Sequence, residues 1–326
     1  MKRTLLTLSL ALLTGCPYTD SSAPGTGIQQ LLTTGYHACI IDGLGDFHCK
    51  WTTGEPVDMG EGWLSGGRNF IAGATGQNNV CLIHDPDGDG AGDILCTALN
   101  DHRYSDEPDA TFEGDFVQVI AEGAICGLDT AGELTCFESW GSYLDDQFES
   151  LPAGPFESIH GYGGSLFGMV CGVNAAGESS CIGAGPAYSR AMDVCPLPSE
   201  KIADMDFGDG VAILLEDGSI EGWKHGLPTT EGDCLSRPAS SVHTVELAYN
   251  AVCTMVPEGI PACEPIDSSE ETSLSTEVPS GNFMELSAQG AFADFACVLA
   301  ASDEVTCWGV GWEGPSTFGF GGTLVD

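Results

Sequence analysis

Short runs of alternating apolar and polar residues recur along the chain in pairs, and each pair is joined by a glycine-containing turn. The stretch CGLDTAGELTC, from Cys126 to Cys136, shows the pattern: two alternating runs flank Thr130-Ala131-Gly132, and the two cysteines lie equidistant from the centre. An antiparallel hairpin places such cysteines opposite each other. The pattern therefore predicts a β-hairpin closed by a disulfide.

Related hairpins are expected from one end of the chain to the other. They run from Cys39 to Cys49, Cys81 to Cys96, Cys126 to Cys136, Cys171 to Cys181, Ala212 to Gly222, Cys253 to Cys263 and Cys297 to Cys307. Their starts are separated by 42, 45, 45, 41, 41 and 44 residues. Self-similarity at a constant period is the signature of a repeat architecture.

A further alternating run precedes each hairpin, so every repeat offers at least three strands. These runs are 28–32, 70–73, 116–120, 156–159, 202–205, 242–247 and 283–286. No long amphipathic helical pattern is present. Small antiparallel sheets repeated every 40 to 50 residues are typical of a β-propeller, in which neighbouring blades bury each other's faces. We expect an all-β, seven-bladed propeller over residues 28–326, with repeats of about 43 residues.

The stretches FVQVIAEGAICGLDTAGELTCFES and MELSAQGAFADFACVLAASDEVTCWGVG carry a family resemblance. An apolar strand, a glycine, a small apolar strand, an acidic-glycine turn and a final strand often followed by tryptophan resemble the repeats of the regulator of chromosome condensation (RCC1-like) family, in its cysteine-bearing bacterial exported form. The Gly-Gln-Leu-Gly stretch common between such repeats is mostly absent, so the eukaryotic exchange-factor role is not carried over. Exported relatives include an inhibitor of β-lactamase.

The fifteen cysteines predict disulfides rather than a metal or redox centre, because no short Cys-x-x-Cys spacing occurs. Six pairs lie within hairpins, and closing such a loop stabilises by roughly 3 kcal/mol. If Cys16 is lipidated, only Cys195 and Cys234 are left over, and they flank the cysteine-free fifth copy. The expected bonds are Cys39–Cys49, Cys81–Cys96, Cys126–Cys136, Cys171–Cys181, Cys195–Cys234, Cys253–Cys263 and Cys297–Cys307.

The first residues predict export. Lys2 and Arg3 precede an apolar run from Leu5 to Leu13 that is too short to span a bilayer, and Leu13-Thr14-Gly15-Cys16 resembles the bacterial lipobox. We expect a signal peptide at 1–15, lipidation of Cys16 and a flexible tether at 16–27. An ordinary signal peptide is the alternative. The expected location is the bacterial cell envelope, at the outer membrane or cell surface, with the membrane reached only through the lipid anchor.

The charge of the chain excludes one class of partner. Without Lys2 and Arg3 the formal charge moves from -39 to -41, because 48 acidic side chains face seven basic ones. Such a field repels nucleic acid and anionic lipid surfaces. We expect no nucleic-acid partner, and another protein or an extracellular glycan is the expected ligand.

The second hairpin carries an insertion that suits Ca²⁺. Asp85, Asp87, Asp89, Gly90 and Asp93 match the D-x-D-x-D-G-x-x-D loops of integrin-type propellers. Alternating carboxylates around a tight turn supply the hard oxygen ligands that Ca²⁺ prefers. We expect a structural calcium site there and no other cofactor; an acidic loop without an ion is the alternative.

Other candidate chemistry is sparse. No nucleophile elbow, phosphate loop, dinucleotide fingerprint or histidine pair of a metalloprotease is present, and His37 and His48 are interpreted as strand-surface residues. Acidic residues are too abundant for any pair to indicate a glycosidase. The aromatics in phase with the repeat, Trp51, Phe137, Trp223 and Trp308, are expected in the blade core. Trp63, Trp140 and Trp312 fall in variable connections and are candidate contact residues.

These features favour a non-catalytic envelope lipoprotein that presents a propeller for binding protein or glycan. Two alternatives stay open: an enzyme, such as a glycoside hydrolase or lyase, with its site at the channel mouth, and a protein inhibitor of an envelope enzyme. The Ser- and Glu-rich run from Glu264 to Glu277 is expected to be one long solvated loop.

Overall fold

The computed structural model describes most of the chain after its N-terminal segment. The described residues are 27–34, 37–51, 64, 68–76, 79–98, 108–121, 125–137, 151–163, 168–184, 191–208, 210–223, 230, 233–238, 240–248, 251–266, 272–289, 295–309 and 315–320. Cys16, Trp63, Trp140, Trp312 and the expected signal peptide and tether lie outside them.

The fold is all-β, as expected from the alternating pattern. The strands are β1 (Ile28–Thr34), β2 (His37–Asp42), β3 (Phe47–Trp51), β4 (Phe70–Thr75), β5 (Asn79–His84), β6 (Gly92–Ala98), β7 (Ala110–Ile120), β8 (Cys126–Asp129), β9 (Leu134–Cys136), β10 (Ser158–Gly163), β11 (Gly168–Val173), β12 (Ser179–Ala184), β13 (Ile202–Phe207), β14 (Val211–Leu215), β15 (Ile220–Trp223), β16 (Cys234–Arg237), β17 (Thr244–Leu247), β18 (Ala251–Met255), β19 (Pro261–Pro265), β20 (Phe283–Gln289), β21 (Phe295–Ala300), β22 (Glu304–Gly309) and β23 (Ser316–Gly319). One short helix, α2 (Ser273–Thr276), follows β19.

The strands form antiparallel sheets in simple meander order: β1-β2-β3, β4 through β9, β10-β11-β12, β13 through β16, β17-β18-β19 and β20 through β23. The second and third repeats share one sheet because β7 is long enough to serve both. Its first half pairs with β6, where Cys96 lies opposite Ala110, and its second half pairs with β8, where Ile120 lies opposite Cys126.

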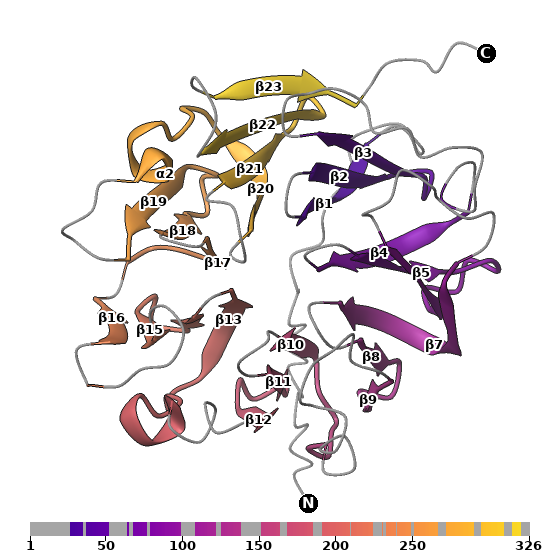
Figure 1. Cartoon of the computed structure of the whole chain (residues 1–326), viewed down its shortest axis with the longest axis horizontal. Coiled ribbons are helices and arrows are strands. Elements are labelled where there is room, and N and C mark those ends of the chain that lie inside the picture. Colours follow the sequence, from indigo (N-terminus) through magenta and orange to yellow (C-terminus); the bar gives the residue numbers. More distant parts are fainter. Residues whose placement is uncertain are drawn as a thin grey trace, which may run out of the picture.

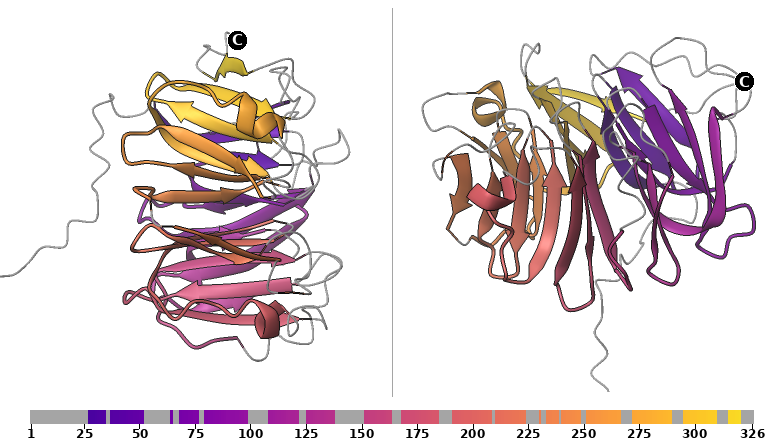
Figure 2. Two further views of the ribbon diagram at one scale, coloured as in Figure 1. Left: turned by 90° about the vertical axis from the view of Figure 1, so that its left-hand side faces the viewer. Right: turned by 60° about the horizontal axis from the view of Figure 1, so that its bottom comes forward.

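The sheets are arranged around a common centre, and the first strand of each repeat lies nearest the middle (Figure 1). These inner strands contact one another in the order β1, β4, β7, β10, β13, β17, β20 and back to β1. Seen from the side, neighbouring sheets pack face to face around the ring (Figure 2).

The core lies between the sheets, because each sheet has too few residues to bury its own faces. Ile41 of β2 packs with Val80 and Leu82 of β5, and Ile40 on the same strand packs with Phe295 of β21 on the other side. Adjacent residues of an inner hairpin thus serve two different interfaces, since side chains alternate across a strand.

All seven expected cysteine pairs are bonded. The six hairpin pairs lie directly opposite each other across two strands, as Cys126 and Cys136 do. The seventh bond, Cys195–Cys234, joins two parts of the chain that are not in one hairpin. Cys195 lies in the segment between β12 and β13, and Cys234 begins β16, the last strand of the sheet that has no hairpin disulfide.

The cysteine-free hairpin keeps the same register, with Ala212 opposite Gly222. Gly222 has a φ of 133°, and a Cβ there would lie 2.0 Å from the Val211 carbonyl oxygen. No cysteine fits this backbone without a shift.

A recurring backbone hydrogen bond ties five of the hairpin turns to the next repeat. Gly132 has a φ of 77°, and its carbonyl accepts the Phe156 N–H at 2.9 Å. Equivalent bonds join Phe70 to Gly45, Ile202 to Gly177, Ser240 to Gly218 and Phe283 to Gly259. The turn glycines therefore also set the spacing between neighbouring repeats.

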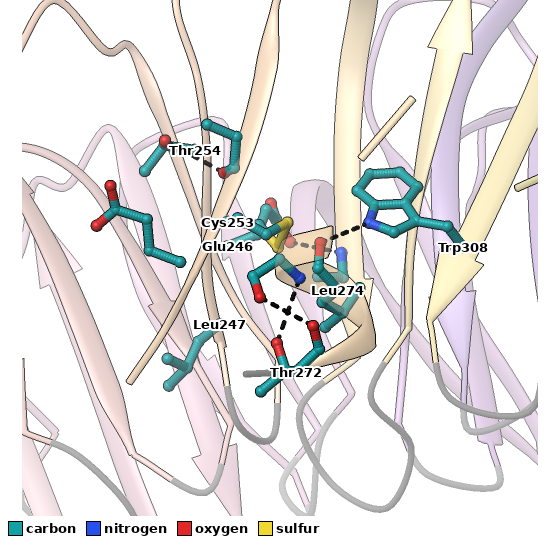
Figure 3. The surroundings of a disulfide bond; sticks show 12 residues. Glu246, Leu247, Cys253, Thr254, Thr272, Leu274 and Trp308 are labelled. Atoms are coloured by element: carbon teal, nitrogen blue, oxygen red, sulfur yellow. Dashed lines mark hydrogen bonds between the residues drawn. A yellow bond between two sulfur atoms is a disulfide. The ribbon is translucent and has the colours of Figure 1, made fainter. Parts of the chain in front are cut away.

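One expectation about a connection is wrong. The run from Glu264 to Glu277 is not wholly solvated, because it contains α2 and its Leu274 side chain is fully buried. The Trp308 indole Nε1 donates to the Leu274 carbonyl oxygen at 3.1 Å, beside the Cys253–Cys263 disulfide (Figure 3). Trp308 and Trp223 are core residues, as expected, whereas Trp51 and Phe137 are only half-buried.

The ring closes without strand exchange within the described residues, because the first sheet is formed by 28–51 and the last by 283–319. Asp303, with a φ of 62°, takes the place of the turn glycine, and its Oδ1 accepts the Ile28 N–H at 3.2 Å. Lys50 adds a bond from Nζ to the Gly319 carbonyl at 2.6 Å. Residues 323–325, at the end of the chain, lie outside the described part. Among the described helices, none has the length and apolar character needed to cross a bilayer.

Candidate functional site

Polar side chains recur at the same place in the inner strands and reach across to the next sheet. We call them the inner-edge set: Gln30 of β1, Gln118 of β7, His160 of β10, Asp204 and Asp206 of β13, Glu246 of β17 and Glu285 of β20. Each hydrogen-bonds the backbone of the following inner strand. The set consists of an amide part, an acidic part and one histidine, His160.

The amide part makes two-point contacts. Gln30 Nε2 donates to the Gly73 carbonyl at 3.1 Å, and its Oε1 accepts the Gly73 N–H at 2.8 Å. Gln118 binds Ile159 in the same way, at 2.9 and 3.0 Å. An amide can satisfy a backbone donor and acceptor at once because it carries both functions.

The acidic part only accepts. Asp204 Oδ2 accepts the Val245 N–H at 3.0 Å, and Asp206 Oδ2 accepts that of Leu247 at 2.6 Å. Glu246 Oε2 accepts the Ala288 N–H at 3.0 Å. Glu285 Oε2 accepts the Leu31 N–H at 2.9 Å, which links the last sheet to the first.

These four carboxyl groups are largely surrounded by protein, although each residue keeps some accessible area. The loss of hydration is the largest effect on their pKa values. Burial, with a smaller contribution from the charge of Asp204, raises the pKa of Asp206 to about 7, although backbone hydrogen bonds from Leu247 and Phe207 lower it. Burial also raises the pKa of Glu285 to about 7. Desolvation favours the neutral acid, so these two groups exchange protons near neutral pH.

Mutual repulsion adds to burial in the middle of the acidic part. The pKa of Glu246 lies well above its usual value because of burial and then because of Asp206 and Asp204. The pKa of Asp204 is raised by burial, against the opposing effect of His160. Burial lowers the pKa of His160, which hydrogen-bonds the Met205 backbone and holds Ser158 Oγ at 3.1 Å from Nε2.

Carboxylic acids with such pKa values can donate or accept a proton near neutral pH. Each described carboxyl group nevertheless uses one oxygen to hold a neighbouring strand, so its primary task is structural. The sequence alone did not single out these residues, because acidic side chains are abundant throughout. The signal that could have found them is a polar residue within an apolar run that precedes a hairpin, as with Gln30, Gln118 and Glu246.

The acidic insertion forms a compact turn between β5 and β6. Ligand oxygens of Asp85, Asp87 and Asp89 lie within 4.8 Å of one another. Asp85 is only 2% exposed, enclosed by the backbone of its own loop, and accepts the N–H groups of Gly88 at 2.7 Å and Gly90 at 2.8 Å. Asp93 lies outside this group of three, and its Oδ1 accepts the Gly114 N–H of β7 at 2.9 Å.

The charges of this loop resemble those of a cation site. Burial raises the pKa of Asp85, but bonds from Gly90, Gly88, Asp87 and Asp89 outweigh it and leave the pKa below its usual value. The pKa of Asp87 is raised, first by its hydrogen bond with Asp85 and then by the charge of Asp89. A cation between these groups would relieve the repulsion.

Comparison with known proteins supports the fold and no family. No protein-family model matches the chain, and no curated protein matches it. Solved structures are similar in fold at low sequence identity.

Human WBSCR16 matches with a TM-score of 0.54 and 11% identity, over 81% of this chain and 85% of that one. The CRINKLY WD40 ectodomain of the Arabidopsis thaliana receptor kinase ACR4 matches with a TM-score of 0.52 and 14% identity, over 87% and 98%. BBS1N in complex with ARL6DN matches with a TM-score of 0.50 and 10% identity, over 90% and 96%. These structural neighbours identify the β-propeller fold.

Proposed function

We propose that this chain is a non-catalytic binding protein whose β-propeller presents a surface to another protein. The observation that carries the proposal is that ionisable and exposed apolar side chains occupy different parts of the fold. The ionisable inner-edge side chains hold neighbouring sheets together, whereas large apolar side chains are exposed in two hairpin turns, at Leu44 and Ile260, and on strands β7 and β20, at Val117 and Met284.

Two of these residues, Ile260 and Met284, lie on neighbouring parts of the backbone. Ile260 is 51% exposed in the β18–β19 turn, and Met284 is 37% exposed at the start of β20. The hydrogen bond from Phe283 N to the Gly259 carbonyl, at 2.7 Å, brings their backbones together. Exposed apolar side chains on a rigid scaffold favour protein contact over a glycan. BBS1N, similar in fold, is a propeller neighbour in complex with a protein, ARL6DN.

The proposal is tested by cross-linking the full chain in its native envelope and identifying the attached proteins. The double variant Ile260→Glu/Met284→Glu changes only the exposed pair. The control is Ala203→Glu, at an exposed position of β13. We expect a protein captured by wild type and control to be lost with the double variant. Identical capture by all three chains would contradict a contact at Ile260 and Met284, and capture of no protein would contradict the proposed function.

The setting of this function follows from the sequence. We propose seven blades, with β7 shared between two of them, export by residues 1–15, and lipidation of Cys16 in the cell envelope. Mass spectrometry of the N-terminal peptide tests the lipid, and a Cys16→Ser variant released from the membrane fraction would support it. A peptide that retains residues 1–15 would contradict the processing.

We also propose that Asp85, Asp87 and Asp89 bind a structural Ca²⁺, and that Asp93, which lies outside this group of three, joins only if its side chain moves. Calorimetry with Ca²⁺ should give heat for wild type and none for Asp87→Asn/Asp89→Asn. Absence of heat for the wild type, under conditions where a control protein binds, would remove the site.

A second candidate is an enzyme with its site at the inner edge, favoured by the near-neutral pKa values of Asp206 and Glu285. A glycoside hydrolase or lyase needs an acid and a base at such a place. Wild type but not Asp206→Asn should then turn over a polysaccharide. Equal product from both chains, or none from either, would contradict this candidate.

A further inference from the structure

A second group of metal-ligating side chains lies in the first hairpin, away from the acidic insertion. Asp42 ends β2, Asp46 closes the turn, and His48 lies on β3. One ligand atom from each lies within 4.8 Å of the others. The group differs from the acidic insertion because it contains an imidazole.

The hairpin orients the group before any ion arrives. Asp42 Oδ1 accepts the N–H groups of Leu44 and Asp46, both at 2.9 Å. This leaves Oδ2 directed at His48, whose Nε2 lies 3.3 Å away. The Cys39–Cys49 disulfide closes the hairpin beside His48 and limits its motion. The His48 and Asp42 side chains are 34% and 25% exposed, so an ion can reach them from solvent.

Equivalent hairpins provide an internal comparison. Asp129 and Asn174 begin the same turn, with the same pair of backbone bonds to the side-chain oxygen. The residues equivalent to Asp42, Asp46 and His48 are Asp129, Glu133 and Thr135; Asn174, Glu178 and Ser180; Leu215, Ser219 and Glu221; Val256, Ile260 and Ala262; and Ala300, Glu304 and Thr306. The turn therefore accounts for the aspartate but not for the histidine, which is particular to the first hairpin.

We propose that Asp42, Asp46 and His48 bind a divalent transition-metal ion, with Zn²⁺ as the representative. Imidazole nitrogen and carboxylate oxygen together suit Zn²⁺, whereas Ca²⁺ prefers oxygen alone. Three protein ligands leave a coordination position for water or for a donor from a bound partner. The strongly negative chain raises the local concentration of cations around the site. The proposal gives His48 a role in addition to the strand-surface position that the sequence indicated.

The test uses Zn²⁺ alone with the full, oxidised chain, after any free thiol has been alkylated. Calorimetry at neutral pH should show one Zn²⁺ equivalent bound by the wild type. His48→Gln should weaken that binding by about tenfold or more, because it removes the nitrogen ligand. The matched variant Asp129→Asn, in the equivalent turn without histidine, should leave the affinity unchanged.

Histidine-ring NMR signals provide a readout that does not depend on heat. Zn²⁺ should shift one set of ring signals, and that set should be missing from His48→Gln. Circular dichroism of each variant confirms folding, and Asp46→Asn serves as a second variant because it retains the imidazole. Equal Zn²⁺ affinity of wild type, His48→Gln and Asp46→Asn would overturn the proposal.

Transplanting the histidine sharpens the test. Thr135→His completes the same three positions in the third hairpin, next to Asp129 and Glu133. Binding of a second Zn²⁺ equivalent would support the conclusion that the histidine decides the site. An unchanged single equivalent would overturn that conclusion.

Discussion

Two arcs of the ring solve the same packing problem with different chemistry. Between β1 and β4, and between β7 and β10, an amide joins neighbouring strands by donating and accepting at once. From β13 to β17, β20 and back to β1, carboxyl groups only accept backbone N–H groups. The geometry is shared, but only the second arc carries a charge that changes with pH.

The difference shows that the side chain of an inter-sheet hydrogen bond can be neutral at every pH, as an amide is, or can gain and lose a proton, as a carboxyl group does. An amide holds its neighbour equally well at any pH near neutrality. A buried carboxylate forms a stronger, charge-assisted bond but loses hydration in doing so. The raised pKa values of Asp206 and Glu285 show that the hydration loss outweighs the bonds these groups receive.

Exchanging the chemistry in the amide arc should have the largest effect. Gln118→Glu removes the donor to the Ile159 carbonyl and places a carboxylate beside it, leaving a buried acceptor unsatisfied. We expect a loss of about 3 kcal/mol in the free energy of unfolding at pH 8. Urea denaturation measures it, with Val117→Glu, which places the same charge at the exposed position next to Gln118, as control. A loss no larger than that of the control would show that the amide contact is unimportant.

The pH dependence of stability should be next in size. Asp204, Asp206, Glu246 and Glu285 have pKa values raised by burial, so the folded state binds protons more tightly than the unfolded state. Their contribution to stability is greatest below the unfolded pKa values and is lost as pH rises through the folded pKa values, which are about 7 for Asp206 and Glu285.

His160 acts in the opposite sense, because its lowered pKa makes the folded state less stable as pH falls below the unfolded value. Four carboxyl groups outweigh one imidazole, so the free energy of unfolding should be roughly 2 kcal/mol larger at pH 5 than at pH 8, after allowance for partial exposure. Thermal unfolding across this range measures it. Stability that falls steadily from pH 8 to pH 5 would contradict the assignment.

The reverse exchange in the acidic arc should have a smaller effect of opposite sign. Glu246→Gln keeps an acceptor for the Ala288 N–H and removes a charge that Asp204, Asp206 and Glu285 repel. We expect a gain of about 1 kcal/mol at pH 8 and little change at pH 5, where the acid is already neutral. Denaturation at both pH values measures the difference. A loss at pH 8 would mean that the charge-assisted bond exceeds the cost of burial.

The seam where the ring closes should show the smallest effect. Asp303→Ala removes the bond from Ile28 N and keeps a side chain at a positive φ, so we expect a loss of about 1 kcal/mol. Asp303→Gly removes the same bond but suits the backbone, and should lose less. Hydrogen exchange of the Ile28 amide reports on the seam directly. Equal protection in all three chains would show that this bond does not close the ring.

The repeat and its pairing could be predicted because they depend on local pattern. Cys126 and Cys136 are opposite each other in the structure, and the cysteine-free copy keeps its register at Ala212 and Gly222. The acidic insertion was found in the same way, but the pattern also included Asp93, whose contact with Gly114, 21 residues away, could not be seen in the sequence. The burial of Leu274 was missed because polar neighbours surround it in sequence.

The amino-acid sequence by itself determined the hairpins and the cysteine partners, since alternation and turn chemistry act over a few residues. Only the tertiary structure decided which polar residues hold the ring together. Gln118 and Glu246 occupy similar places in their apolar runs, yet their partners lie 41 and 42 residues away, in other sheets. His48 is a local case, because Asp42 and Asp46 lie in its own hairpin and the turn brings them to its ring. Proximity across sheets and turns, which sets desolvation and repulsion, is a property of the folded chain.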